Sequence, residues 1–349
     1  MAVLAGRAPA ADVARIGSNT YATLHAAVAA APSNATVELI GNAVLTNTLA
    51  IIRPLAIISD GAVRTITRTN AFAADLIYVQ APGSLTLGSP SGNDAAPVLY
   101  LDGGALNGVT GGYSFVFAEN ASVTMNPGVV VQRFCGLYAA LYMYDTNGLA
   151  SLTLNGGRFA ENTNTNTPGG AVCSQGADIV IRDTVFAGNK ALRGRGGAVY
   201  TEYAGLTATN LTIENNAADD YGGGLMGFPA EIDLTGGIFT GNTAINGGGI
   251  ANGYGTVTIS GTLFTNNRAF YGGGFWSHTG TNRILSAVLR NNQATNFGAA
   301  LYSTSSRYIL SNSQVIANTA GSNGGGLYVS PATNPPSTVE ILASVVSSN

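Results

Sequence analysis

Residues 211–250 read LTIENNAADDYGGGLMGFPAEIDLTGGIFTGNTAINGGGI, and two motifs each occur twice in this stretch. The first is an apolar-x-x-Asn motif, which ends at Asn216 and again at Asn242. The second is a glycine triplet, which begins at Gly222 and again at Gly247. Because the two motifs return together after almost the same interval, they identify an internal repeat.

Both motifs extend outward from this stretch. The glycine signature recurs at steps of 27, 26, 25, 25, 26 and 26 residues, beginning at Gly169, Gly196, Gly222, Gly247, Gly272, Gly298 and Gly324. The motif asparagine recurs at Asn162, Asn189, Asn216, Asn242, Asn267, Asn292 and Asn318, and once more at the final residue, Asn349. Two independent motifs that stay in step over seven repeats indicate a solenoid.

The segments between the motifs predict short β-strands. Thr256–Ser260 (TVTIS) and residues 206–213 (LTATNLTI) alternate apolar and polar residues and are rich in β-branched side chains. A unit of about 25 residues cannot bury its apolar face alone, but stacked coils about 4.8 Å apart can. The sequence therefore predicts an all-β fold, a single-stranded parallel β-helix.

The repeated asparagines and glycines have a structural explanation in such a fold. Asparagine tolerates the left-handed backbone conformation of corners, and its amide can bond to its counterpart one coil away. We therefore expect the seven motif asparagines to form a ladder. Glycine supplies positive φ angles and a close approach of backbones at another corner.

The start of the chain is predicted to cap the solenoid. Residues 20–31 are the one convincing amphipathic helix, and such a helix would cover the open core. We divide one continuous domain into a lead-in and cap helix (1–35), irregular coils (36–160) and regular coils (161–349). We expect no signal peptide in residues 1–12 and no barrel or anchor in the given sequence. We expect a segment of a longer protein, whose open end could associate end to end with another copy.

The composition excludes several classes of partner and cofactor. Only 9% of residues are charged, the net charge is −3, and Lys190 is the single lysine. Nucleic acids and anionic lipids require clustered Lys and Arg, so neither is expected as a partner. No apolar run approaches the roughly 20 residues that span a bilayer. Cys135 and Cys173 form neither a disulfide framework nor a zinc set, and we expect no metal and no cofactor.

The alternation of Gly-Gly-Ala-aliphatic with Phe-x-x-Asn resembles the repeats of chlamydial polymorphic outer membrane proteins, which also occur in other bacterial surface proteins. The likeness covers roughly residues 159–349, and residues 20–41 (TYATLHAAVAAAPSNATVELIG) are similar to the start of several bacterial β-helix surface domains. The resemblance implies a right-handed, pectate-lyase-like β-helix on a bacterial surface, in adhesion or as a stalk. It implies no catalytic residue.

A polysaccharide-active enzyme is the alternative, since β-helices of this shape often cleave polysaccharides. Alignment of the repeats sets Asp219 and Asp220 opposite Arg193 and Arg195 of the preceding coil, and these four residues are the candidate catalytic cluster. The plainer interpretation is a surface ion-pair ladder. We expect His278 in a turn. No acidic residue is close to it in sequence, so it has no carboxylate partner with which to act as a general base.

A row of aromatic side chains is the candidate binding site. An aliphatic residue follows each glycine signature, and if it points inward, the next residue points outward. The large aromatics at these next positions are Tyr200, Trp276, Tyr302 and Tyr328, in a row with Cys173, Met226 and Ala251. Exposed aromatic rows stack on sugar rings or contact proteins. The alternative is that these rings are buried or shielded by a turn.

The leading hypothesis is a non-catalytic, extracellular or cell-surface β-helix that serves as an adhesin or a rigid spacer. Its partner would be a glycan or a host or neighbouring surface protein. The competing hypothesis is a lyase or glycoside hydrolase, which a cleft lined by carboxylates within about 10 Å of one another would favour. An ice-binding face is a weaker alternative, because outward threonines do not recur coil after coil.

Overall fold

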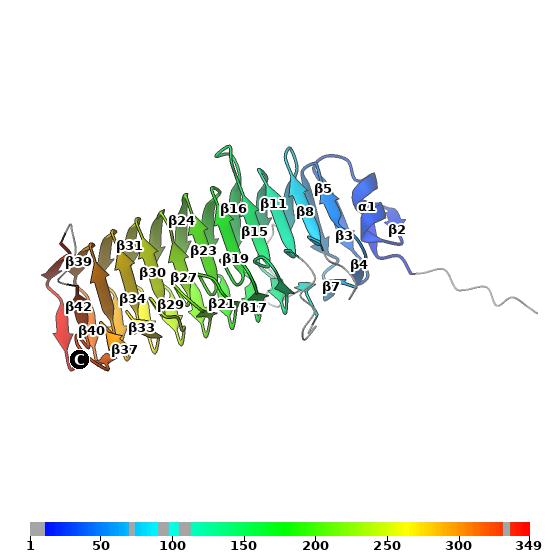
Figure 1. Ribbon diagram of the computed structural model, residues 1–349. Coiled ribbons are helices and arrows are strands. Elements are labelled where there is room, and N and C mark those ends of the chain that lie inside the picture. Colours follow the sequence, from blue (N-terminus) through cyan, green and yellow to red (C-terminus); the bar gives the residue numbers. More distant parts are fainter. Residues whose placement is uncertain (1–10, 70–73, 90–97, 105–112, 331–335) are drawn as a thin grey trace, which may run out of the picture.

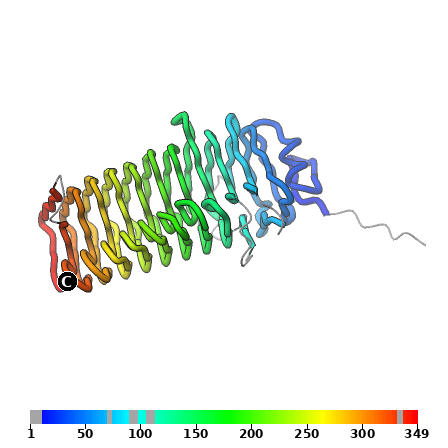
Figure 2. The backbone as a smooth tube through the Cα atoms, viewed as in Figure 1, coloured from blue at the N-terminus to red at the C-terminus, as the bar shows by residue number. Residues whose placement is uncertain are grey.

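The protein is a parallel β-helix in a computed structural model that describes residues 11–69, 74–89, 98–104, 113–330 and 336–349. Successive coils stack along one axis from the N-terminal helix to the C-terminus (Figures 1 and 2). Residues 1–10 of the predicted lead-in lie outside the described residues. The predicted all-β solenoid is confirmed.

Three long sheets form the walls of the solenoid. Sheet A contains β2 (Asn19–Tyr21), β1 (Ala14–Ile16), β3 (Ala35–Leu39), β6 (Leu55–Ser59), β9 (Ser84–Leu87), β12 (Ser122–Met125), β16 (Ser151–Asn155), β20 (Asp178–Arg182), β24 (Ala204–Thr209), β28 (Ala230–Thr235), β31 (Thr256–Ser260), β35 (Thr281–Leu285), β39 (Arg307–Ser311) and β43 (Thr338–Leu342). Sheet B contains β4 (Ala43–Leu45), β7 (Arg64–Arg68), β10 (Leu99–Asp102), β13 (Val129–Gln132), β17 (Arg158–Ala160), β21 (Val185–Ala187), β25 (Thr212–Glu214), β29 (Ile238–Thr240), β32 (Leu263–Thr265), β36 (Val288–Arg290), β40 (Gln314–Ile316) and β44 (Val345–Ser347). Sheet C contains β5 (Leu49–Ile51), β8 (Ile77–Gln80), β11 (Val116–Glu119), β15 (Leu141–Tyr144), β19 (Val172–Gln175), β23 (Val199–Glu202), β27 (Leu225–Gly227), β30 (Ile250–Gly253), β34 (Phe275–His278), β38 (Leu301–Thr304) and β42 (Leu327–Val329).

Two short sheets lie between sheets B and C in the order of the chain. One contains β14 (Cys135–Gly136), β18 (Thr163–Asn164), β22 (Lys190–Ala191) and β26 (Ala217–Ala218). The other contains β33 (Arg268–Tyr271), β37 (Gln293–Phe297) and β41 (Thr319–Ala320). Most regular coils thus run through sheet C, sheet A, sheet B and a short sheet, and the next coil pairs in parallel. The coil after β29 links the two short sheets only through isolated bridges at Thr243 and Asn246.

A continuous apolar core runs through the described part of the solenoid. The aliphatic residue after each glycine signature points inward, as expected: Val172, Val199, Leu225, Ile250, Phe275 and Leu301 are buried in one continuous core. Sheet B adds phenylalanines that stack between coils, with ring centroids 5.0 Å apart for Phe159 and Phe186. Because like residues recur at one register, each coil packs on a matching surface of the next.

The N-terminal cap differs in its boundary from the prediction. The helix α1 (Leu24–Ala30) starts four residues later than residue 20, because Thr23 is its N-cap and accepts a hydrogen bond from Ala26 N. Asn19–Tyr21 instead pairs antiparallel with β1. Leu24, Ala27 and Val28 are buried in the core, so the helix closes this end of it. Within the described ranges, no helix has the length and hydropathy to span a bilayer.

The motif asparagines lie inside the solenoid in a continuous hydrogen-bonded ladder. Each side-chain amide donates to the side-chain oxygen of the asparagine one coil on and to a backbone carbonyl of the preceding coil. The prediction that the ladder asparagine itself has the left-handed backbone conformation is wrong, however. Positive φ belongs to the residue before the ladder asparagine, such as Asn215, Asn266 or Gly241, because the asparagine itself must point inward.

The glycine signature folds the chain back on itself. Its first glycine has a positive φ in every repeat, for example +66° at Gly222 and +66° at Gly272. The residue just before it therefore lies over the outer face of sheet C: the Tyr271 ring lies 5.0 Å from Tyr302, and Tyr221 4.8 Å from Trp276. These reversals cover the outer face of sheet C with a second layer of rings.

Asp75, just before β8, is expected to make stability depend on pH. Its Oδ1 accepts a hydrogen bond of 2.8 Å from Ser114 N, and burial raises its pKa to about 6 from 3.8. The native state holds this proton to a higher pH than the unfolded state does. The free energy of unfolding should therefore fall as the pH rises from about 4 to about 6. Asp75→Asn keeps the acceptor and should remove this fall, which thermal unfolding of both proteins between pH 3.5 and 7.5 would measure. Parallel profiles for the two proteins would contradict the assignment.

Candidate functional site: an aromatic pocket on the outer face of sheet C

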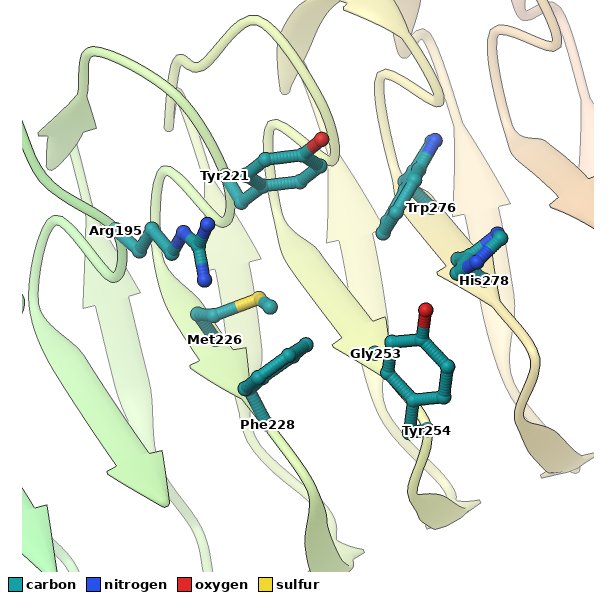
Figure 3. A pocket seen from close by; sticks show the side chains of 8 residues that line it. All are labelled: Arg195, Tyr221, Met226, Phe228, Gly253, Tyr254, Trp276 and His278. Carbon is teal, nitrogen blue, oxygen red and sulfur yellow. The ribbon is translucent and has the colours of Figure 1, made fainter.

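A cavity of about 320 Å³, here called the aromatic pocket, opens on the outer face of sheet C. It is lined by Arg195, Tyr221, Met226, Phe228, Gly253, Tyr254, Trp276 and His278. Figure 3 shows the rings around an open space, with the Arg195 guanidinium at one side of it. The volume is at the low end of ligand pockets, so it suits one ring-sized unit.

The pocket exists because one coil of sheet C carries small residues. Ala251 pairs with Met226 on one side and with Trp276 on the other. Gly253 pairs with His278, and a Cβ atom on it would lie 2.6 Å from the Phe228 ring. The larger side chains of the flanking coils therefore stand about 10 Å apart, with a depression between them.

The rings are held at fixed angles to one another. Tyr254 stands perpendicular to its two neighbours, with centroid distances of 5.5 Å to Phe228 and 5.2 Å to His278. His278 in turn stacks on Trp276 at 6.1 Å, and Tyr221 contacts Trp276 at 4.8 Å. Edge-to-face and stacked contacts of this kind lower the energy of the ring arrangement. The pocket is thus largely preformed.

Arg195 is the residue with a full charge in the lining of the pocket. Its guanidinium carbon lies 5.3 Å from the Tyr221 ring centre and 5.4 Å from that of Phe228. Asp220 lies outside the lining, and its Oδ2 is 3.7 Å from Arg195 Nε, which is longer than a direct hydrogen bond. Burial raises the pKa of Asp220, an effect that Arg195 opposes.

A second cavity of about 700 Å³, here called the corner cavity, adjoins the first and shares Tyr254 with it. It lies where the chain passes from sheet C to sheet A, and Tyr203, Asp178 and Glu231 line it. Gly205 separates the two acids, since it pairs with Glu231 and donates its N–H to Asp178 Oδ1 at 2.8 Å. Together the cavities reach from one face of the solenoid around its corner.

The predicted aromatic row follows the outer face of sheet C, but much of it is covered. Cys173, Tyr200, Met226, Ala251, Trp276, Tyr302 and Tyr328 pair in one continuous register. Tyr200 is only 3% exposed and Trp276 9%, whereas Tyr302 and Tyr328 are half-buried. Of the two interpretations, the structure favours shielding for Tyr200 and Trp276, because residues that precede the glycine signature pack over this face. Trp276 alone of the four predicted rings lines the aromatic pocket.

The predicted acid–arginine cluster is divided by the structure. Asp219 accepts a hydrogen bond from the backbone N of Arg193 at 3.0 Å, so it holds a turn together rather than meeting a guanidinium. Asp220 forms the long ion pair with Arg195. Of the four, only Arg195 lines the aromatic pocket. His278 is the last residue of β34 and lines the same pocket, so its placement in a turn was wrong.

Four pocket residues were missed by the sequence reasoning: Tyr221, Phe228, Gly253 and Tyr254. One signal was readable, since an aromatic residue directly precedes the signature at Tyr221, Tyr271 and Phe297. Phe228 and Tyr254 stand in turns where no repeat motif marks them, so only the folded corner brings them to the pocket.

The described residues contain neither a cluster of metal ligands nor an activated thiol. Among the described ranges, no three His, Cys, Asp or Glu side chains group as metal ligands. Cys135 and Cys173 are free, and burial raises the pKa of both thiols, so neither forms a thiolate readily.

The comparisons with known proteins bear on one repeat. Residues 183–202 match the Chlamydia polymorphic membrane protein repeat. The matched segment runs from β21 to β23 and contains the ladder Asn189 and the signature Gly196. The chain matches no curated protein and no solved structure. The repeat match and the stacked coils support the resemblance to β-helix surface proteins and suggest a bacterial surface or outer membrane protein.

Proposed function

We propose that this chain is an extracellular, non-catalytic segment of a bacterial surface protein that acts as an adhesin and binds a sugar in the aromatic pocket. The observation that carries the proposal is the pocket itself, a preformed depression with five rings in its lining. The β-helix would hold this pocket on a rigid rod, away from the surface that carries it.

The chemistry of the lining favours a sugar. Ring faces match the apolar face of a pyranose, while the Tyr254 hydroxyl, the Trp276 N–H and the His278 nitrogens can bond to its hydroxyl groups. A peptide added as a strand is disfavoured, because β27, β30 and β34 are each paired on both sides. Recognition at this site therefore depends on side chains.

The corner cavity favours a second candidate, a glycoside hydrolase. Asp178 and Glu231 stand two coils apart, about 10 Å between backbones. Inverting glycoside hydrolases hold their two carboxyl groups about 6.5–9.5 Å apart. This pair replaces Asp219 and Asp220 as the catalytic pair to test. Reducing-end release from a polysaccharide panel, lost in Glu231→Gln, would establish this candidate over the adhesin.

The binding test is calorimetric titration with neutral and acidic polysaccharides, with and without calcium. We expect saturable heat, and we expect Trp276→Ala to raise the dissociation constant at least tenfold, because truncation of a buried aromatic residue at a binding site costs about 2 kcal/mol or more. The matched control is Tyr144→Ala, which removes an exposed ring of sheet C outside the pocket. Binding that survives Trp276→Ala, or continuous heat from turnover, would contradict the proposal.

A further inference from the structure

Arg195 gives the aromatic pocket a charge preference. Its guanidinium carbon lies 5.3 Å from the centre of the Tyr221 ring and 5.4 Å from that of the Phe228 ring. The guanidinium also interacts with Asp220 and with the Tyr200 hydroxyl, and its N–H groups that face the cavity can bind a carboxylate. The stacking also fixes the side chain, so less freedom is lost when a ligand binds.

The ion pair between Arg195 and Asp220 does not prevent Arg195 from binding a ligand carboxylate. The Arg195–Asp220 contact is 3.7 Å long, and both side chains are partly exposed, at 37% and 45%. Partly exposed ion pairs of this length contribute little to stability, because solvent screens them. A ligand carboxylate that bonds directly can therefore compete with Asp220.

The same residue argues against a cationic ligand. A cage of rings alone is the usual site for a quaternary ammonium group. Here one cation already occupies two of the rings, and no carboxylate lines the pocket to offset a second one. The pocket thus selects a group that is flat, hydroxylated and negatively charged.

The corner cavity determines what lies next to that group. Tyr254 borders both cavities, so a chain of sugars can pass over it from one to the other. Asp178 and Glu231 on the far side accept hydrogen bonds from hydroxyl groups but repel a second carboxylate. An acidic unit is therefore favoured in the aromatic pocket and a neutral unit in the corner cavity.

We propose that the two cavities form one groove for an oligosaccharide that contains a carboxylate-bearing sugar, with its carboxylate bound to Arg195 and a neutral sugar beside Asp178 and Glu231. This inference rests on the proposed sugar binding. It adds that the ligand is an acidic oligosaccharide, and it states which sugar occupies which cavity. It predicts that an acidic-neutral disaccharide binds more tightly than a disaccharide of two acidic sugars.

The experiment titrates the protein with methyl glucuronide, its neutral counterpart methyl glucoside, glucuronosyl-N-acetylglucosamine and digalacturonate, each by calorimetry. The glucuronide should bind at least tenfold more tightly than the glucoside, and the acidic-neutral disaccharide more tightly than digalacturonate. Arg195→Gln should remove the first difference, whereas Arg193→Gln, an exposed neighbour outside the pocket, should keep it. Glu231→Gln should reduce the difference in affinity between the acidic-neutral disaccharide and digalacturonate.

A salt series on the unchanged protein gives a readout that needs no variant. Affinity for the glucuronide should fall as sodium chloride rises from 20 to 500 mM, while affinity for the glucoside stays constant. Equal affinity for the two sugars, with both lost in Trp276→Ala, would overturn the role of Arg195 and leave the sugar site standing. Binding of none of the four probes would overturn the sugar site and this inference together.

Discussion

Gly247→Ala is expected to lower the free energy of unfolding by about 2–5 kcal/mol, from the left-handed backbone and the overpacking together. Gly247 has a φ of +68°, and a Cβ atom there would overlap the carbonyl oxygen of Ile250. The chain itself supports this expectation. Alanine occupies the second signature position at Ala299 and the third at Ala198, but all seven first positions are glycine.

The matched control is Gly261→Ala. Gly261 has nearly the same φ, +65°, but a Cβ atom there would have nothing within 4 Å. This variant therefore isolates the conformational cost, about 1–2 kcal/mol. Urea unfolding followed by circular dichroism measures both variants. Equal losses would show that the close approach at the glycine signature has no energetic role.

Asn216→Ala is expected to cost a similar amount, about 3–5 kcal/mol, because several buried polar groups lose their partners at about 1–3 kcal/mol each. The Asn216 amide donates to Phe186 O and to Asn242 Oδ1, both at 3.0 Å. Its Oδ1 accepts from the backbone N and the side-chain amide of Asn189, at 2.8 and 2.9 Å. Alanine replaces none of these bonds.

The neighbouring Asn215 provides the control, because it is exposed and has a φ of +56° that glycine adopts freely. Asn215→Gly should change the midpoint of thermal unfolding by only a few degrees, whereas Asn216→Ala should lower it much further. A loss in Asn215→Gly as large as that in Asn216→Ala would mean that the corner, rather than the ladder, stabilises the coil.

The repeat predicted the fold well, because the solenoid depends on local motifs that recur at a fixed interval. The errors arose where one residue's position depends on its neighbours in space. Thr20 and Tyr21 suit a helix by pattern, yet they pair with β1, and Thr23 begins the helix instead. Likewise, the ladder asparagine points inward, and the residue before it, such as Asn215, has the left-handed conformation.

The candidate site was predicted only in part. Trp276 was found as a member of the aromatic row, and Arg195 was found for a different reason, as a partner of Asp220. Their meeting in one pocket depends on the small Ala251 and Gly253 between larger rows, and on the fold-back that brings Tyr221 over sheet C. The aromatic residue before the glycine signature is visible in the sequence, but its contact with Trp276 depends on the packing of different coils.

Trp276 offers the most direct measurement of the central claim, because it is the single tryptophan of the chain and lines the pocket. Its fluorescence would be followed while the protein is titrated with the sugar that gives the largest calorimetric heat. We predict a saturable change in emission with the same dissociation constant as the heat. Saturating heat with unchanged Trp276 emission would place the bound sugar elsewhere and contradict the assignment of the aromatic pocket as the binding site.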